Sequence, residues 1–89
     1  MAFALDRPWA LDPQVALRPE RFGALAYHFG TRRLSFLKSR PLLRVVESLA
    51  DQPTARAACA EAGVPAGELP RYEQALATLA ETGMIRART

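Results

Sequence analysis

Residues 22–38 read FGALAYHFGTRRLSFLK, and this stretch decides the fold. Large apolar side chains alternate with small or polar ones over residues 24–29, which is the two-residue period of a β-strand. Gly30 supplies a turn, because glycine takes positive φ without strain. Alternation resumes over residues 32–37. Two such runs joined by a glycine turn predict a β-hairpin.

The chain before the hairpin predicts one more strand and an arm. Val15, Leu17 and Pro19 lie on one face of an extended segment, and we expect Pro19 to end its pairing because proline lacks an N–H. With the hairpin, this segment gives a three-stranded antiparallel meander. Residues 1–13 contain two prolines and no clear period, so we expect a mobile arm or an extended lead-in, with Trp9 packed against the body.

Residues 39–89 are predicted to be helical, since alanine becomes dense and aromatic residues become rare. Ser39 is the expected N-cap of a first helix, with a proline in its first turn. Thr54 is the expected cap of a second helix, which Gly63 ends. A third amphipathic helix is expected over residues 68–82. A three-stranded antiparallel sheet followed by a three-helix bundle predicts an α+β domain.

The composition is that of one small globular domain. The chain has 89 residues, which leaves room for one core but little for an enclosed active site. We expect residues 1–13 to form the arm and residues 14–89 the domain. The net charge of +3 comes from scattered residues, so it predicts mild attraction to acidic partners rather than a nucleic-acid footprint.

The sequence favours a reducing compartment away from membranes. Cys59 is the single cysteine, so no internal disulfide can form. No apolar run is long enough to span a bilayer. The apolar start of the chain ends at Asp6, which is too early for a signal peptide. We therefore expect a cytoplasmic protein.

The usual elements of catalysis are missing, so we expect no enzyme and no cofactor. His28 is the single histidine and lies in a predicted strand, where a packed or surface role is more common than acid–base work. One histidine and one cysteine on different elements do not make a metal site. Cys59 lies on the apolar face of a helix, which is typical of a small buried hydrophobe. No glycine-rich phosphate loop occurs.

The third strand, residues 32–38, is a candidate peptide-binding edge. It has no internal proline or glycine, is basic at both ends and apolar between them. An edge of this kind accepts a partner strand through backbone hydrogen bonds. The sequence leaves open whether this strand lies at the edge, lies in the centre of the sheet, or is covered by a helix.

The helical half also fits a small winged-helix regulator that binds nucleic acid. A helix that reads DNA needs exposed basic or amide side chains. The third helix instead offers few polar contact candidates against three acids, which would repel phosphate. The polar candidates are Arg71, Gln74 and Thr78, and the acids are Glu68, Glu73 and Glu81. Nucleic-acid binding is therefore the weaker alternative.

Three motifs resemble the peptide chaperones of the mycofactocin system. They are VALRPE at residues 15–20, FGALAY at residues 22–27 and LSFLK at residues 34–38. The resemblance is dense over residues 9–38, and the spacing of the helical half agrees. The chain resembles more distantly the pyrroloquinoline quinone peptide chaperones. It also resembles the wider class of recognition elements for ribosomally synthesised and post-translationally modified peptides (RiPP recognition elements).

The resemblance implies a winged-helix-like domain that binds the leader of a precursor peptide. In this class the leader adds as a strand beside the third strand, in the groove against the third helix, and is delivered to a radical S-adenosylmethionine (SAM) maturase. The implied partners are thus the mycofactocin precursor peptide and that maturase, with no nucleic acid and no membrane. Any iron–sulfur cluster would belong to the maturase. We expect a monomer when the chain is free.

The candidate peptide-binding residues lie on the third strand and the third helix. We expect backbone bonds from the strand and side-chain contacts from the helix, where two leucines are also core candidates. The basic residues of the set are candidates for pairing with leader carboxylates. The set is Arg32, Arg33, Leu34, Ser35, Phe36, Leu37, Lys38, Arg71, Tyr72, Ala75, Leu76 and Leu79.

Overall fold

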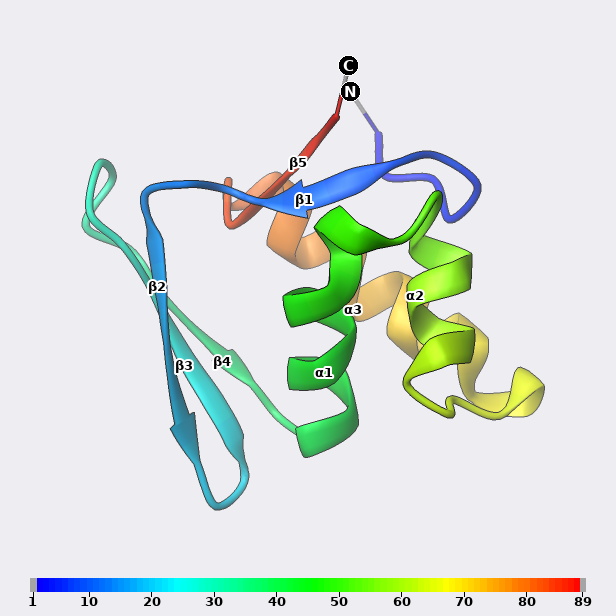
Figure 1. The fold of residues 1–89 in the computed structure, drawn as a ribbon. Coiled ribbons are helices and arrows are strands. Elements are labelled where there is room, and N and C mark those ends of the chain that lie inside the picture. Colours follow the sequence, from blue (N-terminus) through cyan, green and yellow to red (C-terminus); the bar gives the residue numbers. More distant parts are fainter. Residues whose placement is uncertain (1, 89) are drawn as a thin grey trace.

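A computed structural model describes residues 2–88. Its main sheet is antiparallel and contains β2 (Val15–Glu20), β3 (Gly23–His28) and β4 (Leu34–Leu37). The strand order is β2-β3-β4, so β3 is central and β4 lies at an edge. Figure 1 shows that the helices lie on one side of this sheet. The predicted meander is confirmed, and the third strand is an edge strand.

Three α-helices follow the sheet and confirm the predicted α+β fold. They are α1 (Arg40–Ser48), α2 (Ala55–Glu61) and α3 (Leu69–Glu81). Single 3₁₀ turns extend α1, as η1 (Leu49–Asp51), and precede α3, as η2 (Ala66–Glu68). The helices are short because the connecting segments contain proline and glycine.

The predicted helix caps are present. The Leu42 backbone N–H donates to the Ser39 hydroxyl oxygen over 3.2 Å, and the Ala57 N–H donates to the Thr54 hydroxyl oxygen over 3.1 Å. These bonds satisfy N–H groups that have no partner inside a helix. Gly63 has φ +81°, the left-handed conformation that ends α2. Local sequence signals therefore set these boundaries.

The expectation that Pro19 ends the first strand is wrong, because β2 continues to Glu20. The Phe29 N–H donates to the Gln14 carbonyl over 2.8 Å, so this pair is hydrogen-bonded across β2 and β3. Along an antiparallel ladder, hydrogen-bonded pairs alternate with pairs that have no hydrogen bonds between them. Counting from Gln14 and Phe29, the pair of Pro19 and Ala24 is one without hydrogen bonds. Its missing N–H faces the free edge of the sheet, where proline is tolerated.

A second, two-stranded sheet joins the two ends of the chain and was not predicted. β1 (Trp9–Leu11) pairs antiparallel with β5 (Ile85–Ala87). Trp9 is buried, as expected, and its indole N–H donates to the Ala4 carbonyl over 2.9 Å. Trp9–Leu11 is thus an extended strand that pairs with the other end of the chain. Three-residue strands are too short to show a period.

The core lies between the inner face of the main sheet and the helices. The sheet contributes small side chains, so the helices approach it closely. Ala24 and Ala26 of β3 are fully buried, together with Leu37 of β4. Val45 of α1 and Leu76 of α3 are buried against this layer. The alternate positions of the two strands, which include Tyr27 of β3 and Phe36 of β4, therefore lie on the opposite, outer face of the sheet.

Candidate peptide-binding groove

The backbone of β4 is unpaired along one side. The His28 N–H donates to the Arg33 carbonyl over 2.9 Å, so this pair is hydrogen-bonded to β3. The alternation of an antiparallel ladder then directs the backbone of Ser35 and Leu37 toward β3 as well. The N–H and C=O groups of Leu34 and Phe36 face the open edge. Within the sheet, β4 therefore offers the backbone of two residues to an added strand.

A groove runs between β4 and α3, where the two elements do not pack closely. It consists of two hollows of about 430 and 300 Å³ that share Lys38, Leu42 and Ala75. The first turn of α1 forms part of its wall, because α1 begins directly after β4. Ala75 is small and leaves room in the middle. The groove is long and mainly apolar, which suits a peptide in extended form.

Charged side chains line part of the groove. Arg71 lies at the start of α3, and its Nη1 atom is 3.9 Å from the Glu68 carboxylate. Both side chains are well exposed, so this ion pair adds little stability and leaves the guanidinium available to a ligand. Lys38 borders both hollows. These two cations would favour carboxylates in a bound peptide.

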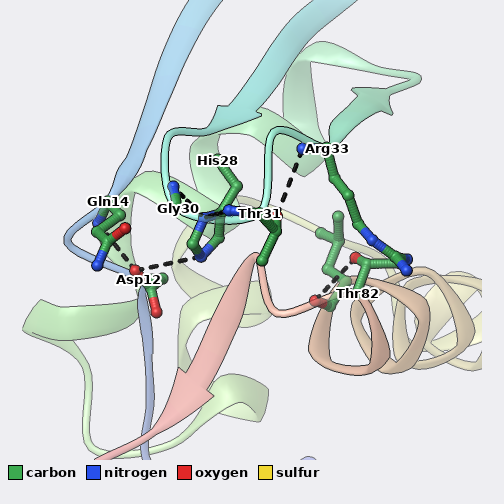
Figure 2. Close-up of polar contacts among 8 residues, drawn as sticks. Asp12, Gln14, His28, Gly30, Thr31, Arg33 and Thr82 are labelled. Atoms are coloured by element: carbon green, nitrogen blue, oxygen red, sulfur yellow. Dashed lines mark hydrogen bonds and ion pairs between the residues drawn. The ribbon is translucent and has the colours of Figure 1, made fainter.

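The structure brings together seven of the twelve candidate residues as lining of the groove. These are Ser35, Phe36, Lys38, Arg71, Tyr72, Ala75 and Leu79. Leu37 and Leu76 are fully buried in the core. Arg32, Arg33 and Leu34 are exposed and do not line it. Figure 2 shows the Arg33 side chain directed toward Thr82, just beyond the end of α3.

Five further residues line the groove, and sequence reasoning did not include them among the peptide-binding candidates. They are Ser39, Pro41, Leu42, Glu68 and Thr78. Three of them belong to the start of α1, which the sequence explained fully as a capped helix end. The sequence did contain one indication that these residues lie at the groove. The predicted third strand leads into the first helix without a loop, and such a connection places the first helical turn beside the edge of the strand.

His28 holds the β3–β4 turn together (Figure 2). The backbone N–H groups of Gly30 and Thr31 donate to its Nδ1 atom over 3.0 and 3.1 Å. Its Nε2 atom is 3.6 Å from Asp12 Oδ1, which also accepts from the Gln14 N–H over 2.8 Å. Nδ1 is thus an acceptor, so Nε2 carries the proton in the neutral ring. The role is structural.

Cys59 is fully buried in α2, and burial raises the pKa of its thiol. A raised pKa lowers the thiolate fraction, so this sulfur is a poor nucleophile. Within residues 2–88, no cluster of three or more His, Cys, Asp or Glu side chains could hold a metal ion. Likewise, none of the described helices is long and apolar enough to cross a membrane.

The fold and the groove define a small α+β module with an open strand edge beside an apolar groove, the arrangement that strand-accepting domains use. The chain belongs to the peptide chaperone MftB family, whose model matches residues 8–86.

Three curated relatives carry the name peptide chaperone MftB. The protein of Mycobacterium ulcerans is 58% identical over 84 residues, covering 94% of this chain and 77% of the relative. That of Mycobacterium tuberculosis is 57% identical over 83 residues, covering 93% and 76%. That of Mycolicibacterium smegmatis is 52% identical over 85 residues, covering 96% and 83%. No solved structure matched the chain.

Proposed function

We propose that this chain binds the leader segment of the mycofactocin precursor peptide and delivers it to a radical SAM maturase, without catalysing a reaction itself. The leader adds as a strand to the free edge of β4 and lies in the groove against α3. The observation that carries the proposal is the unpaired backbone of Leu34 and Phe36 directly beside an apolar groove. Its membership of a peptide chaperone family supports a peptide as the ligand.

The two edges of the sheet differ in a way that favours β4. The β2 edge carries Pro19, which has no N–H to offer and blocks strand addition. The β4 edge carries no proline between residues 32 and 38. A partner strand at β4 would find both donors and acceptors, and its alternate side chains would enter the groove. The two cations that line the groove, Lys38 and Arg71, would attract leader carboxylates.

The test is a pair of substitutions at one position on the edge. Leu34→Pro removes the N–H that points to the free edge of β4 and leaves the hydrogen bonds between β3 and β4 in place. Leu34→Ala keeps that N–H and removes only an exposed side chain. We expect Leu34→Ala to bind the leader within about twofold of wild type and Leu34→Pro to bind at least about tenfold more weakly. Isothermal titration calorimetry with the leader and, separately, the C-terminal core peptide measures this.

Ser35 is not a useful proline site, because its N–H faces β3 and Ser35→Pro would damage the sheet itself. Phe36→Pro provides a second edge variant. Melting curves must show each proline variant folded. If a folded Leu34→Pro and a folded Phe36→Pro both bind the leader as wild type does, or if the core peptide binds equally well, strand addition at β4 is wrong.

A further inference from the structure

The outer face of the β2-β3-β4 sheet points away from the helices (Figure 1). Several large apolar side chains, aromatic ones among them, lie on this face. On this face Leu25 lies opposite Phe36, and Tyr27 lies opposite Leu34. Across residues 2–88, the large hydrophobic side chains that remain exposed all belong to this hairpin. They are Phe22, Phe29, Leu34 and Phe36, at 45%, 61%, 59% and 59% exposure. A clustered exposure of this kind marks an interaction surface.

The aromatic rings on this face are already arranged in pairs. The Tyr27 and Phe29 rings meet edge to face, with centroids 5.1 Å apart and planes at 81°. The Phe22 and Phe36 rings are 6.2 Å apart at the other end of the hairpin. Rings held by their neighbours lose little conformational freedom on binding, and aromatic anchors dominate protein–protein interfaces. The face is therefore suited to a folded protein partner.

The charge around this face selects the partner. Residues 15–38 contain one acid, Glu20, which accepts from Arg18 over 2.8 Å. The same residues contain five bases, namely Arg18, Arg21, Arg32, Arg33 and Lys38, of which Arg33 is directed toward the end of α3. The remainder of the chain carries seven bases and eight acids, so the positive excess belongs to the sheet. Two copies placed face to face would bring like charges together, whereas a partner with carboxylates would be attracted.

The outer face is continuous with the proposed leader groove. Phe36 and Lys38 line the groove, and with Phe22 they also line a hollow of about 350 Å³ on the other side of β4. A protein docked on the outer face would therefore lie beside a leader strand paired with β4. The docked protein could therefore bind this chain and, at the same time, receive the far end of the peptide whose leader is paired with β4.

We propose that the outer face of the main sheet is the docking surface for a folded protein whose own surface is apolar in the centre and carries carboxylates around it. The inference rests on the proposed function, under which that protein is the radical SAM maturase. Aromatic side chains at the two ends of the hairpin provide the anchors, and Arg18 and Arg21 provide the charge on the β2 side, away from the groove.

The test uses the full chain, the leader peptide and the purified maturase. Phe22→Ser/Phe29→Ser removes one exposed ring from each end of the face, and neither residue lines the groove. Arg18→Glu/Arg21→Glu reverses the charge on the β2 side. Arg86→Glu makes the same type of charge change on the separate β1–β5 sheet and is the matched control. Surface plasmon resonance measures binding to the immobilised maturase, and calorimetry measures binding to the leader.

We expect both double variants to lose at least about tenfold in affinity for the maturase while leader affinity changes by less than about twofold. The control should bind both ligands as wild type does. Unchanged maturase binding by either folded double variant, or no maturase binding by wild type, would overturn the proposal. Two other results would also overturn it. In the first, wild type dimerises with rising concentration and the double variants do not, although they still bind the maturase. In the second, wild type binds anionic lipid vesicles and the double variants do not, although they still bind the maturase. Failure of the leader to bind wild type would instead contradict the proposed function, since maturase binding is measured separately.

Discussion

Gly23 lies directly against the end of β4, with its Cα beside the Leu37 carbonyl oxygen. A Cβ at Gly23 would come within 2.9 Å of the Ser39 backbone nitrogen and closer still to the Leu37 oxygen. The backbone of Gly23 also has φ +154°, which other residues rarely adopt. This contact brings the start of β3 against the junction of β4 and α1, and so fixes the wall of the groove.

Gly23→Ala should therefore destabilise the protein by about 2–4 kcal/mol, because both the steric overlap and the backbone conformation oppose a side chain. Urea denaturation followed by circular dichroism measures the loss. Gly67→Ala is the matched control, since an added Cβ there has nothing within 4 Å. It should be neutral or stabilising by up to about 1 kcal/mol. Equal stability of the two variants would show that β3 can shift away from the junction at no cost.

The His28 turn can be tested by two substitutions. His28→Phe keeps a ring but leaves the N–H groups of Gly30 and Thr31 without their acceptor. We expect a loss of about 1–3 kcal/mol in the free energy of unfolding. His28→Asn retains an acceptor near the Nδ1 position and should recover part of that loss. If the two variants are equally stable in urea denaturation, hydrogen bonding at this turn contributes nothing.

Cys59 should react only after the protein opens. Its thiol is fully buried and burial raises its pKa, so both access and thiolate fraction are low in the folded state. Iodoacetamide at neutral pH should modify native protein at least about a hundredfold more slowly than urea-unfolded protein. Mass spectrometry follows the modification. Comparable rates in the two states would mean that α2 is frequently open.

The same pKa shift predicts a change in stability with pH. Unfolding exposes a thiol that ionises at its ordinary pKa, below that of the buried thiol. Below the ordinary pKa both states keep the thiol protonated, and the shift has no effect on stability. Above it the unfolded state releases the proton first, so stability should fall as pH rises past the ordinary thiol value of 9.0. Cys59→Ala should remove that component of the alkaline decline. An identical decline in both proteins would assign it to other groups.

Leader binding should depend on salt through the cations at the groove. Lys38 and Arg71 line the groove and are exposed, so they would speed the encounter with an acidic leader. We expect the association rate to fall several-fold between about 0.05 and 0.5 M salt and the fall to shrink in Lys38→Ala/Arg71→Ala. Stopped-flow fluorescence measures the rate. Arg44→Ala, an exposed change on α1 outside the groove, should keep the wild-type dependence.

A rate that does not change with salt in the wild type would show that these cations are merely solvated. Duplex DNA at matched salt is the comparison ligand for the alternative of a nucleic-acid regulator. Tighter binding of DNA than of leader would favour that alternative over the peptide.

Much of the candidate site followed from the sequence because its signals are local. The alternation over residues 24–37 and the glycine turn place β4 after β3, and the Ser39 cap places α1 directly after β4. The period of α3 places Tyr72, Ala75 and Leu79 along the groove side of one helix. Each of these features depends on residues within a few positions of one another, so a single sequence reveals them.

Only the tertiary structure decided the rest. A two-residue period defines two faces of a strand but does not say which is buried, and here the helices cover the face of Ala24 and Ala26 and leave the aromatic face open. The direction in which each β4 N–H points depends on the register with β3, which made Ser35 unsuitable as a test position. Pairing of Trp9 with Ala87 joins segments at opposite ends of the chain. The sequence by itself determined the elements and their order. The tertiary packing decided which edge and which face remain free, because those depend on contacts between residues far apart in the chain.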